Sequence, residues 1–428
     1  MSQAVSEKTQ SPETNEKKRR WRMSRRGFLI GLGVTGVGVA VGLKWGVPEG
    51  QLALARMLDN ATAPGSIKAS PLAWFELGPD GSKLYMPKVE MGQGVHTALK
   101  QIALEELDMP WDQLEVVSAS TTHGLNDGFG TGGSTTVSSL FTPLREAAAT
   151  LREMLKAEGA KLLGLSLAEV SVAEGKVFAM RDPSKSLSYA DITSQVSNWQ
   201  VPKKAPALKS LNEFKVIGQP MPRVDFASKL QGTAAYGYDM RLDGMLYGAV
   251  ARGESIESKR LSAKEGSARS VPGVVDVVIN DDIIGVVATS RAAARAGVKA
   301  LEVTWQEHSG LDDAEILKLC TVKPAEGTVI QREGKVNSIF KNANTVISAE
   351  YRSPMAVHAH LEPQAALVDV KPDKVRAWIS TQSPSAIAGQ IAKALGRKKE
   401  EVDVTATYLG GGFGRRLNVE VAFEAAKL

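Results

Sequence analysis

The 428-residue chain contains a single cysteine, Cys320. One thiol excludes an intramolecular disulfide, and it excludes an iron-sulfur cluster or a cysteine-ligated zinc site built by this chain alone. Apolar residues make up 43% of the sequence and charged residues 23%. This composition excludes a disordered, collagen-like or disulfide-scaffold protein and supports a full hydrophobic core. The length predicts two or three domains.

The chain also lacks an excess of basic charge outside its first 26 residues. The formal net charge is +5. Residues 1–26 hold eight of the 52 Lys and Arg but only three of the 47 Asp and Glu, which leaves 44 of each sign in the remainder. A neutral body does not support a groove for phosphates, so we expect no nucleic-acid partner.

The apolar run of the N-terminal leader is too short for a typical membrane span. It covers residues 28–43, sixteen residues with five glycines, whereas a spanning helix needs about 20. It follows Ser-Arg-Arg-Gly-Phe-Leu-Ile at 24–30, which resembles a bacterial twin-arginine export signal with Arg25 and Arg26 as its pair. We therefore expect 1–69 to be signal and linker. The protein would be periplasmic, exported folded by the twin-arginine machinery, and membrane-tethered where the signal stays uncleaved.

Two apparent motifs are not supported by the residues that surround them. Gly31, Gly33 and Gly36 satisfy the G-x-G-x-x-G spacing, but no buried strand precedes them, so a dinucleotide-binding fold is rejected. The histidines at 96 and 123 and the cysteine have no triad-like surroundings. A serine or cysteine hydrolase therefore has little support.

Three glycine-rich segments suggest a ligand-binding role. They are Glu90–Thr97, Gly130–Thr136 and Gly410–Gly414. The first and third stand at expected junctions between a strand and a helix, where free backbone N–H groups and the positive helix end favour anions. Each segment alone is most simply a tight turn. Together they predict one large polyanionic ligand wrapped by backbone amides.

Two further sites have competing interpretations. His358, His360 and Glu362 would share one face of an extended segment and mimic a two-histidine, one-carboxylate metal site. Flanking prolines and the lack of a further ligand favour structural hydrogen bonding instead. Gln382 ends an expected strand where its amide could reach a ligand, although such a residue is by default part of an ordinary turn.

The periodicity of the body predicts an α+β protein. The first unit is expected to contain the elements hairpin 74–87, helix 97–107, strand 114–119 and helix 143–163, followed by an irregular stretch 183–206. The second is expected to contain strands 244–251 and 274–279 and helix 290–300. The third is expected to contain strands 365–370, 375–380 and 402–408 and helix 384–395. A helical pattern over 419–428 breaks off without a cap, so we expect the chain to end inside a domain.

Five ordered motifs together resemble the molybdopterin-binding subunit of the xanthine dehydrogenase/aldehyde oxidase family. They are Met91–Thr97, Gly218–Asp225, His360–Glu362, Ser380–Gln382 and Gly410–Gly414. Their order, with Arg415 and Arg416 directly after the last glycines, is similar to the isoquinoline 1-oxidoreductase beta-subunit branch. The resemblance covers about residues 70–428 and makes the chain look C-terminally truncated.

The resemblance implies the multidomain α+β architecture of a molybdenum-hydroxylase large subunit. Residues 70–205 would be the first molybdopterin-binding domain, 215–310 the small hammerhead domain, and 345–428 the incomplete start of the second molybdopterin-binding domain. Such enzymes oxidise an N-heteroaromatic compound or an aldehyde with water as the oxygen source. They bind molybdopterin cytosine dinucleotide and pass electrons to an iron-sulfur subunit.

The family's functional residues carry over to three groups of positions in the glycine-rich segments and to Gln382. Gly92, Gln93 and Gly94 would contact the pterin, and Gly133, Ser134 and Thr135 its phosphate side. Gln382 would lie near the molybdenum oxo group, and Gly412, Phe413 and Gly414 would face the metal's ligands. No residue would bind molybdenum directly, because the pterin holds it.

One departure from the family affects the expected activity. The family's general base is a glutamate in a Gly-Val-Gly-Glu segment, which this sequence does not contain, and Glu362 is not a substitute. The chain alone would then be inactive. The resemblance also implies a small partner subunit with two [2Fe–2S] clusters, and in the exported branch a cytochrome c acceptor. The alternatives are a non-catalytic truncated fragment or assembly module, and, with less support from the amide-rich loops, a periplasmic solute-binding protein.

Overall fold

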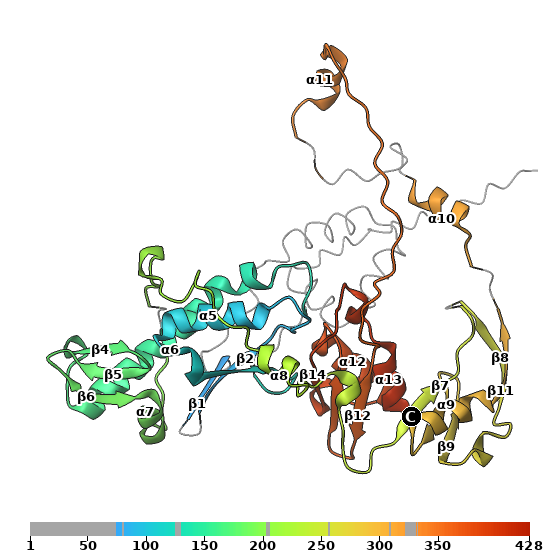
Figure 1. The fold of residues 1–428 in the computed structure, drawn as a ribbon, viewed down its shortest axis with the longest axis horizontal. Coiled ribbons are helices and arrows are strands. Elements are labelled where there is room, and N and C mark those ends of the chain that lie inside the picture. Colours follow the sequence, from blue (N-terminus) through green and yellow to red (C-terminus); the bar gives the residue numbers. More distant parts are fainter. Residues whose placement is uncertain are drawn as a thin grey trace, which may run out of the picture.

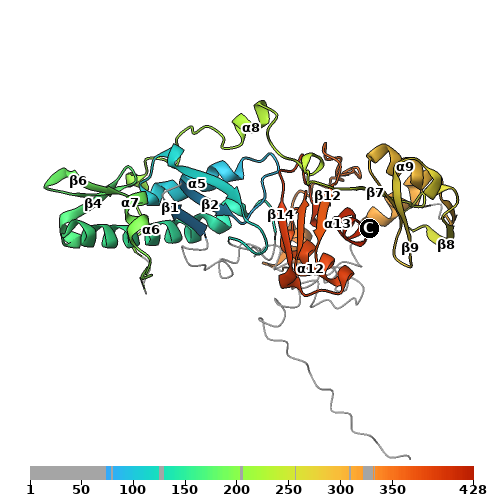
Figure 2. The ribbon, with the colours of Figure 1, turned by 90° about the horizontal axis from the view of Figure 1, so that it is seen from below.

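A computed structural model describes residues 74–428 apart from 79–80, 125–129, 203–205, 256, 308–309, 322–330 and 332. The expected signal, with Arg25 and Arg26, lies outside the described residues. Within the described ranges, no helix combines the length and apolar character needed to cross a membrane. Three units follow one another along the long axis, and the C-terminal unit lies between the other two (Figure 1; Figure 2).

The first unit is built on a mixed three-stranded sheet. Strands β1 (Phe75–Gly78) and β2 (Gly81–Met86) pair antiparallel, and β3 (Leu114–Ser118) pairs parallel to β2. Helix α5 (Val95–Leu107) makes the crossover between β2 and β3. The expected hairpin, helix and strand are therefore confirmed, and the glycine segment after β2 leads directly into α5.

The long helix of this unit starts earlier than expected. Helix α6 spans Thr136–Leu163, so Pro143 lies inside it rather than in its first turn. An interior proline removes one hydrogen-bond donor and costs about 3 kcal/mol or more. The turns before it are nevertheless helical, and Leu140 is fully buried in the core that α6 shares with α5. Packing of that apolar face thus outweighs the local preference of proline for a helix start.

The prediction of an irregular stretch over 183–206 is wrong for its first half. Strands β4 (Val170–Ala173), β5 (Lys176–Ala179) and β6 (Asp182–Ser188) form an antiparallel sheet, followed by α7 (Tyr189–Gln195). Pro183 lies in β6, an edge strand where its missing N–H is tolerated. Ser188 and Asp191 exchange the reciprocal hydrogen bonds of a capping box and so start α7. The polar composition of this stretch concealed both the strand β6 and the helix α7 from the sequence analysis.

The small second unit confirms the α+β expectation. After the short helix α8 (Phe226–Leu230), its first sheet has the order β7-β10-β9 and its second pairs β11 with β8. The bounds of these elements are Tyr247–Val250 for β7, Lys259–Lys264 for β8, Val274–Ile279 for β9, Ile284–Ala288 for β10, Arg291–Lys299 for α9 and Glu302–Gln306 for β11. A Cβ at Gly297 of α9 would lie 2.7 Å from Val286. This close approach seats α9 on the sheet.

The C-terminal unit repeats the connectivity of the first sheet. Strand β13 (Val375–Ile379) pairs antiparallel with β12 (Ala366–Val370) and parallel with β14 (Val402–Ala406), and α12 (Pro384–Leu395) makes the crossover. Helix α13 (Glu420–Lys427) follows the third glycine segment, as α6 follows the second. Two further helices, α10 (Asp313–Cys320) and α11 (Val336–Asn342), precede this unit. The described fold therefore contains the order β-β-α-β-α twice, with a polar loop before each helix.

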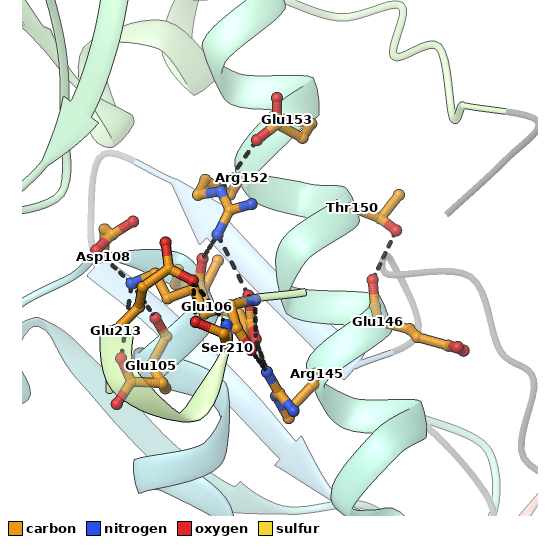
Figure 3. A network of polar contacts seen from close by, with 12 residues as sticks. Glu105, Glu106, Asp108, Arg145, Glu146, Thr150, Arg152, Glu153, Ser210 and Glu213 are labelled. Atoms are coloured by element: carbon orange, nitrogen blue, oxygen red, sulfur yellow. Dashed lines mark hydrogen bonds and ion pairs between the residues drawn. The ribbon is translucent and has the colours of Figure 1, made fainter. Parts of the chain in front are cut away.

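Two adjacent buried carboxylates fasten the chain that leaves the first unit (Figure 3). Glu106 of α5 pairs with Arg145 at 2.7 Å and Arg152 at 3.3 Å. Glu105 accepts hydrogen bonds from the backbone N–H groups of residues 215–217 at 2.8 to 3.1 Å. The linker toward the small unit is thus held on α5 and α6, which fixes where the next segment begins.

Candidate cofactor-binding site

The second and third glycine-rich segments, far apart in sequence, meet at Gln382. Its Nε2 donates to the carbonyl oxygen of Thr131 at 2.8 Å, and its Oε1 accepts from the N–H of Gly414 at 3.1 Å. The side chain is 3% exposed. Gln382 therefore joins the second segment to the third, and the amide keeps one N–H and one acceptor position beyond these two bonds.

The third segment also packs against the first. A Cβ on Gly412 would lie 2.5 Å from the sulfur of Met91 and 2.8 Å from Oε1 of Gln382. A Cβ on Gly130 would lie 2.5 Å from Oγ of Ser383. Real Cβ atoms do not approach other atoms so closely. The segments can meet only because glycine occupies these two positions.

The first segment is organised by Glu90, for which the sequence predicted no role of its own. Its carboxylate accepts from the N–H groups of Gly92 and Gly94, both at 2.9 Å, and from that of His96 at 3.2 Å. The two glycine amides expected to bind the pterin are thus engaged within the chain, and their contact with a cofactor stays a prediction. A carboxylate just before the N-terminus of α5 was the available signal, because anions are stabilised there.

Gln93 is likewise engaged within its own loop. Its Oε1 accepts from the N–H of Met91 at 2.7 Å, and its Nε2 donates to the carbonyl of Val89 at 2.9 Å. The loop is therefore rigid, and the Gln93 side chain serves first to hold it. A direct contact between Gln93 and a cofactor stays a prediction.

The start of the small unit binds the first segment through Arg223 and Asp225. Arg223 donates to the carbonyl of Gly92 at 3.1 Å and forms two hydrogen bonds to Asp225 at 2.9 and 2.7 Å. The Arg223 guanidinium, together with the Lys229 ammonium, holds the pKa of the Asp225 carboxyl far below its ordinary value. These residues belong to the Gly218–Asp225 motif, whose role the sequence did not reveal.

The second segment presents backbone donors at the start of α6. Gly133 and Ser134 have φ angles of 63° and 55°, and both residues are exposed. Among the hydrogen bonds of the described residues, none uses the N–H of Gly133, Ser134 or Thr135. The hydroxyl of Thr135 donates to the carbonyl of Gly132 at 3.2 Å. Adjacent amides in front of a 28-residue helix are suited to an anion.

The third segment presents Phe413, which is 69% exposed at a φ of 53°. Behind it, the fully buried Arg416 donates to the carbonyl of Gly411 at 2.8 Å and pairs with Glu362 at 3.1 Å. The same carboxylate accepts from the N–H of Gly410 at 2.8 Å and from that of Gly237 at 3.0 Å. Arg416 and Glu362 thus shape the segment and connect it to the small unit.

The expected structural role of the His-x-His-x-Glu segment is confirmed for two of its residues. Nδ1 of His360 lies 2.7 Å from the carbonyl oxygen of Glu362, and the Glu362 side chain is engaged as described above. His358 is exposed. In the part of the chain that the structure describes, no three His, Cys, Asp or Glu side chains gather as metal ligands would.

The free backbone N–H groups of the second and third glycine segments fit an anionic cofactor that is held by neutral donors. The amides of residues 133–135, and those of 412 and 413, donate to no acceptor within the described chain. Two buried cations lie at these segments: Arg416 is engaged by internal contacts, and Nζ of Lys88 donates to the carbonyl of Gly130 at 2.7 Å. Backbone donors bind oxyanions without the desolvation cost of a buried cation. A phosphate oxygen or a pterin heteroatom is the kind of acceptor to which these N–H groups can donate.

Two family models described as "Molybdopterin cofactor-binding domain" match the chain, over residues 4–238 and 322–427. A nicotinate dehydrogenase chain of Pseudomonas putida is 31% identical over 85% of this chain and 31% of its own length. The beta chain of isoquinoline 1-oxidoreductase from Brevundimonas diminuta is 30% identical over 95% of this chain and 58% of its own length. A membrane-bound aldehyde dehydrogenase of Gluconacetobacter polyoxogenes, named for pyrroloquinoline quinone, is 30% identical over 94% and 53%.

The chain thus spans between about a third and three fifths of the length of these relatives. The first family model alone covers more than half of the chain, and both carry the same description. These matches confirm the resemblance drawn from the five motifs and the α+β fold that it implies. The chain belongs to the molybdopterin-binding subunits of the xanthine dehydrogenase/aldehyde oxidase family.

Proposed function

We propose that the chain is the molybdenum-cofactor-binding subunit of an exported hydroxylase or dehydrogenase. Its substrate class is an N-heteroaromatic compound or an aldehyde, with water as the source of oxygen. The relatives named for isoquinoline, nicotinate and aldehydes support this class. The observation that carries the proposal is that the buried amide of Gln382 joins the second and third glycine segments, while Gly412 of the third packs closely on Met91 of the first.

The bound group in this proposal is molybdopterin cytosine dinucleotide. When bound, it supplies the two-electron oxidation of the substrate carbon. The amides of Gly133, Ser134 and Thr135 hold its phosphate side, and those of Gly412 and Phe413 donate to groups near the metal. Gln382 keeps one N–H for an acceptor while its other bonds fix its orientation. The pterin side meets the loop that Glu90 holds rigid.

Electron transfer and export require other polypeptides. The single cysteine, Cys320, is exposed in a helix and cannot by itself hold a cluster. We assign the two [2Fe–2S] clusters to a small partner subunit and the next step to a cytochrome c. Arg25 and Arg26 direct the folded chain to the periplasm through the twin-arginine machinery. The unit over 215–310 takes the place of the family's hammerhead domain.

A non-catalytic assembly module is the second candidate. It is favoured by the exposure of every residue from 333 to 359. Such a module would fold, be exported and bind partner chains without turnover. Molybdenum content and activity separate the two candidates.

The deciding experiment measures molybdenum, released cytidine nucleotide and pyrroloquinoline quinone in the natively purified complex. About one molybdenum and one nucleotide per chain is the expected result. The Gly412→Ala variant should lose both, and the matched Gly389→Ala variant, which meets no atom within 4 Å, should keep both. Neither molybdenum nor nucleotide in a folded sample would remove the enzymatic proposal. Quinone in place of molybdenum would reassign the cofactor.

A further inference from the structure

Thr131 lies between the start of the first glycine segment and Gln382, and it forms hydrogen bonds to both. Its Oγ1 accepts from the N–H of Val89 at 2.8 Å. Its N–H donates to the carbonyl oxygen of Gln382, and its carbonyl oxygen accepts from Nε2 of Gln382, both at 2.8 Å. One residue therefore binds a partner 42 positions before it and another 251 positions after it in the sequence.

All three residues of this contact are buried. The exposed fractions are 5% for Val89, 4% for Thr131 and 3% for Gln382. Among the hydrogen bonds of the described residues, the N–H of Val89 has no acceptor other than the Thr131 hydroxyl. A buried N–H that loses its acceptor keeps the full cost of its desolvation. The hydroxyl is therefore needed to keep Val89 in its place.

The residues next to Thr131 and Val89 reinforce the contact. The Lys88 ammonium donates to the carbonyl oxygen of Gly130 at 2.7 Å, so two consecutive residues bind two consecutive residues across the site. A Cβ on Gly130 would lie 2.6 Å from the carbonyl oxygen of Gln382. Because real Cβ atoms do not approach other atoms so closely, only glycine lets Thr131 reach Gln382.

Val89 carries the contact into the loop of the first segment. Its carbonyl oxygen accepts from Nε2 of Gln93 at 2.9 Å. It also directly precedes Glu90, whose carboxylate accepts from backbone N–H groups of the same loop. A displacement of Val89 would therefore move both side chains that keep this loop rigid.

On its other side, Thr131 leads into the amides assigned to the phosphate side of the cofactor. Residues 133–135 follow it closely, and their N–H groups donate to no acceptor within the described chain. The amide of Gln382, which Thr131 orients, keeps one N–H for the same ligand. Thr131 thus sets the spacing between these two groups of donors.

We propose that Thr131 is the positioning residue of the cofactor site, because its hydroxyl holds the first segment while its peptide groups hold Gln382. The segments then keep one relative arrangement, which a ligand contacted by several donors at once requires. Thr131 acts through Val89 and Gln382 and needs no contact with the ligand. This role rests on the proposed function for the identity of the ligand, whereas the hydrogen bonds that carry it do not.

Two substitutions separate the hydroxyl of Thr131 from its shape. Thr131→Val keeps the branched side chain and removes the acceptor of the Val89 N–H, whereas Thr131→Ser keeps the hydroxyl. Thr150→Val is the matched control. Thr150 is also buried, at 7% exposed, but its hydroxyl donates to the carbonyl oxygen of Glu146 within α6 (Figure 3). The control therefore removes a buried hydroxyl that joins no separate segments.

The first measurement is amide hydrogen exchange by mass spectrometry on the natively purified complex. Exchange over residues 89–96 should speed up by about tenfold or more in Thr131→Val. It should return close to the wild-type rate in Thr131→Ser and stay at that rate in Thr150→Val. Unchanged exchange over 89–96 in Thr131→Val, or equal acceleration in the serine variant, would overturn the proposal.

A double-variant comparison distinguishes positioning from a purely local loss of packing. Gln382→Ala should also speed exchange over 89–96, because Thr131 loses a partner and transmits the change through its hydroxyl. Once Thr131→Val has removed the hydroxyl, Gln382→Ala should add little to the exchange over 89–96. Independent local effects would instead multiply, and that result would contradict the proposed role of Thr131.

The second measurement is the rate at which molybdenum and cytidine nucleotide leave the complex. Release should be about tenfold faster in Thr131→Val and near the wild-type rate in Thr131→Ser. Release at the wild-type rate in Thr131→Val would show that the hydroxyl does not position the site.

Two other outcomes are also decisive. Where Thr131→Val yields no folded protein, Gln382→Ala alone should speed exchange over 89–96 and Gln390→Ala should not, and equal effects would overturn the proposal. A wild-type complex without molybdenum or nucleotide would contradict the proposed function, whereas the exchange measurements would still test the role of Thr131. The two failures are therefore distinguishable.

Discussion

Gln382 and Thr131 exchange two hydrogen bonds across 251 residues of sequence. Nε2 of Gln382 donates to the carbonyl of Thr131, and the N–H of Thr131 donates to the carbonyl of Gln382, both at 2.8 Å. The pair joins the loops of two sheets that share one connectivity. Gln382 precedes α12 by two residues, as Gln93 precedes α5, yet only Gln382 reaches across to the other half.

Replacing Gln382 with alanine should reduce both stability and cofactor retention. The change leaves the buried Thr131 carbonyl and the half-buried Gly414 N–H without their partner. Each unsatisfied group costs about 1–3 kcal/mol. Urea unfolding followed by circular dichroism, together with molybdenum analysis, measures both effects. Gln390→Ala in α12, where the amide is half-buried, is the control, with an expected change within about 0.5 kcal/mol. Full stability with lost turnover would assign Gln382 to the chemistry alone.

Gly412→Ala should separate the third glycine segment from the first. Its new methyl group would overlap the Met91 sulfur and Oε1 of Gln382. Overpacking of this kind costs about 1–3 kcal/mol. Gly389→Ala, inside α12 with open space around it, should instead stabilise the chain by about 0.5–1 kcal/mol. Thermal unfolding of the two variants should therefore shift in opposite directions, and equal shifts would contradict the packing described here.

Glu106→Gln should weaken the first unit more than any surface charge change. It removes the charge that compensates Arg145 and Arg152, whose side chains are 9% and 12% exposed. Breaking a buried pair in this way costs about 3–5 kcal/mol. Glu153→Gln removes the other, more exposed partner of Arg152 and should cost about 1 kcal/mol or less. Denaturant unfolding at constant pH distinguishes the two, and a smaller loss for Glu106→Gln would show that the pair is dispensable.

The buried His96 should make stability depend on pH below about 6.5. Burial lowers the pKa of His96 below its ordinary value of 6.5, against the opposing effects of the Lys88 carbonyl, Glu90 and Asp225. Below pH 6.5 the unfolded chain takes up a proton that the folded chain refuses. At high pH the imidazole is neutral in both states and does not affect the free energy of unfolding. As the pH drops below 6.5, the free energy of unfolding falls, by at most about 1.4 kcal/mol per pH unit.

The variant His96→Gln tests this assignment. Its amide can still donate to the Lys88 carbonyl, which lies 2.8 Å from Nε2 of His96, but it does not titrate. The slope of unfolding free energy against pH over this window should flatten in His96→Gln. It should stay unchanged in His123→Gln, where the histidine is 65% exposed. An unchanged slope in His96→Gln would locate the titrating group elsewhere.

Local chemistry made much of the fold predictable. The apolar spacing of Leu99, Ile102 and Leu107 marks α5, and Pro384 at the first position marks α12. Pro143 misled because its preference for a helix start is local, whereas α6 begins earlier to bury Leu140. The capping box of Ser188 and Asp191 was hidden in a polar stretch. The role of Glu90 was missed because its hydrogen bonds depend on how the loop folds back.

The sequence by itself determined the family, the α+β class and the three glycine segments, because these depend on residue identity and order. Only the tertiary structure decided that the second and third segments meet at Gln382, and that Glu90 occupies the amides of Gly92 and Gly94. The first kind of contact joins residues that are distant in sequence, and the second depends on the conformation of a loop. No local sequence pattern encodes either kind. The physical reason is that a backbone N–H binds whichever acceptor the completed fold brings within reach.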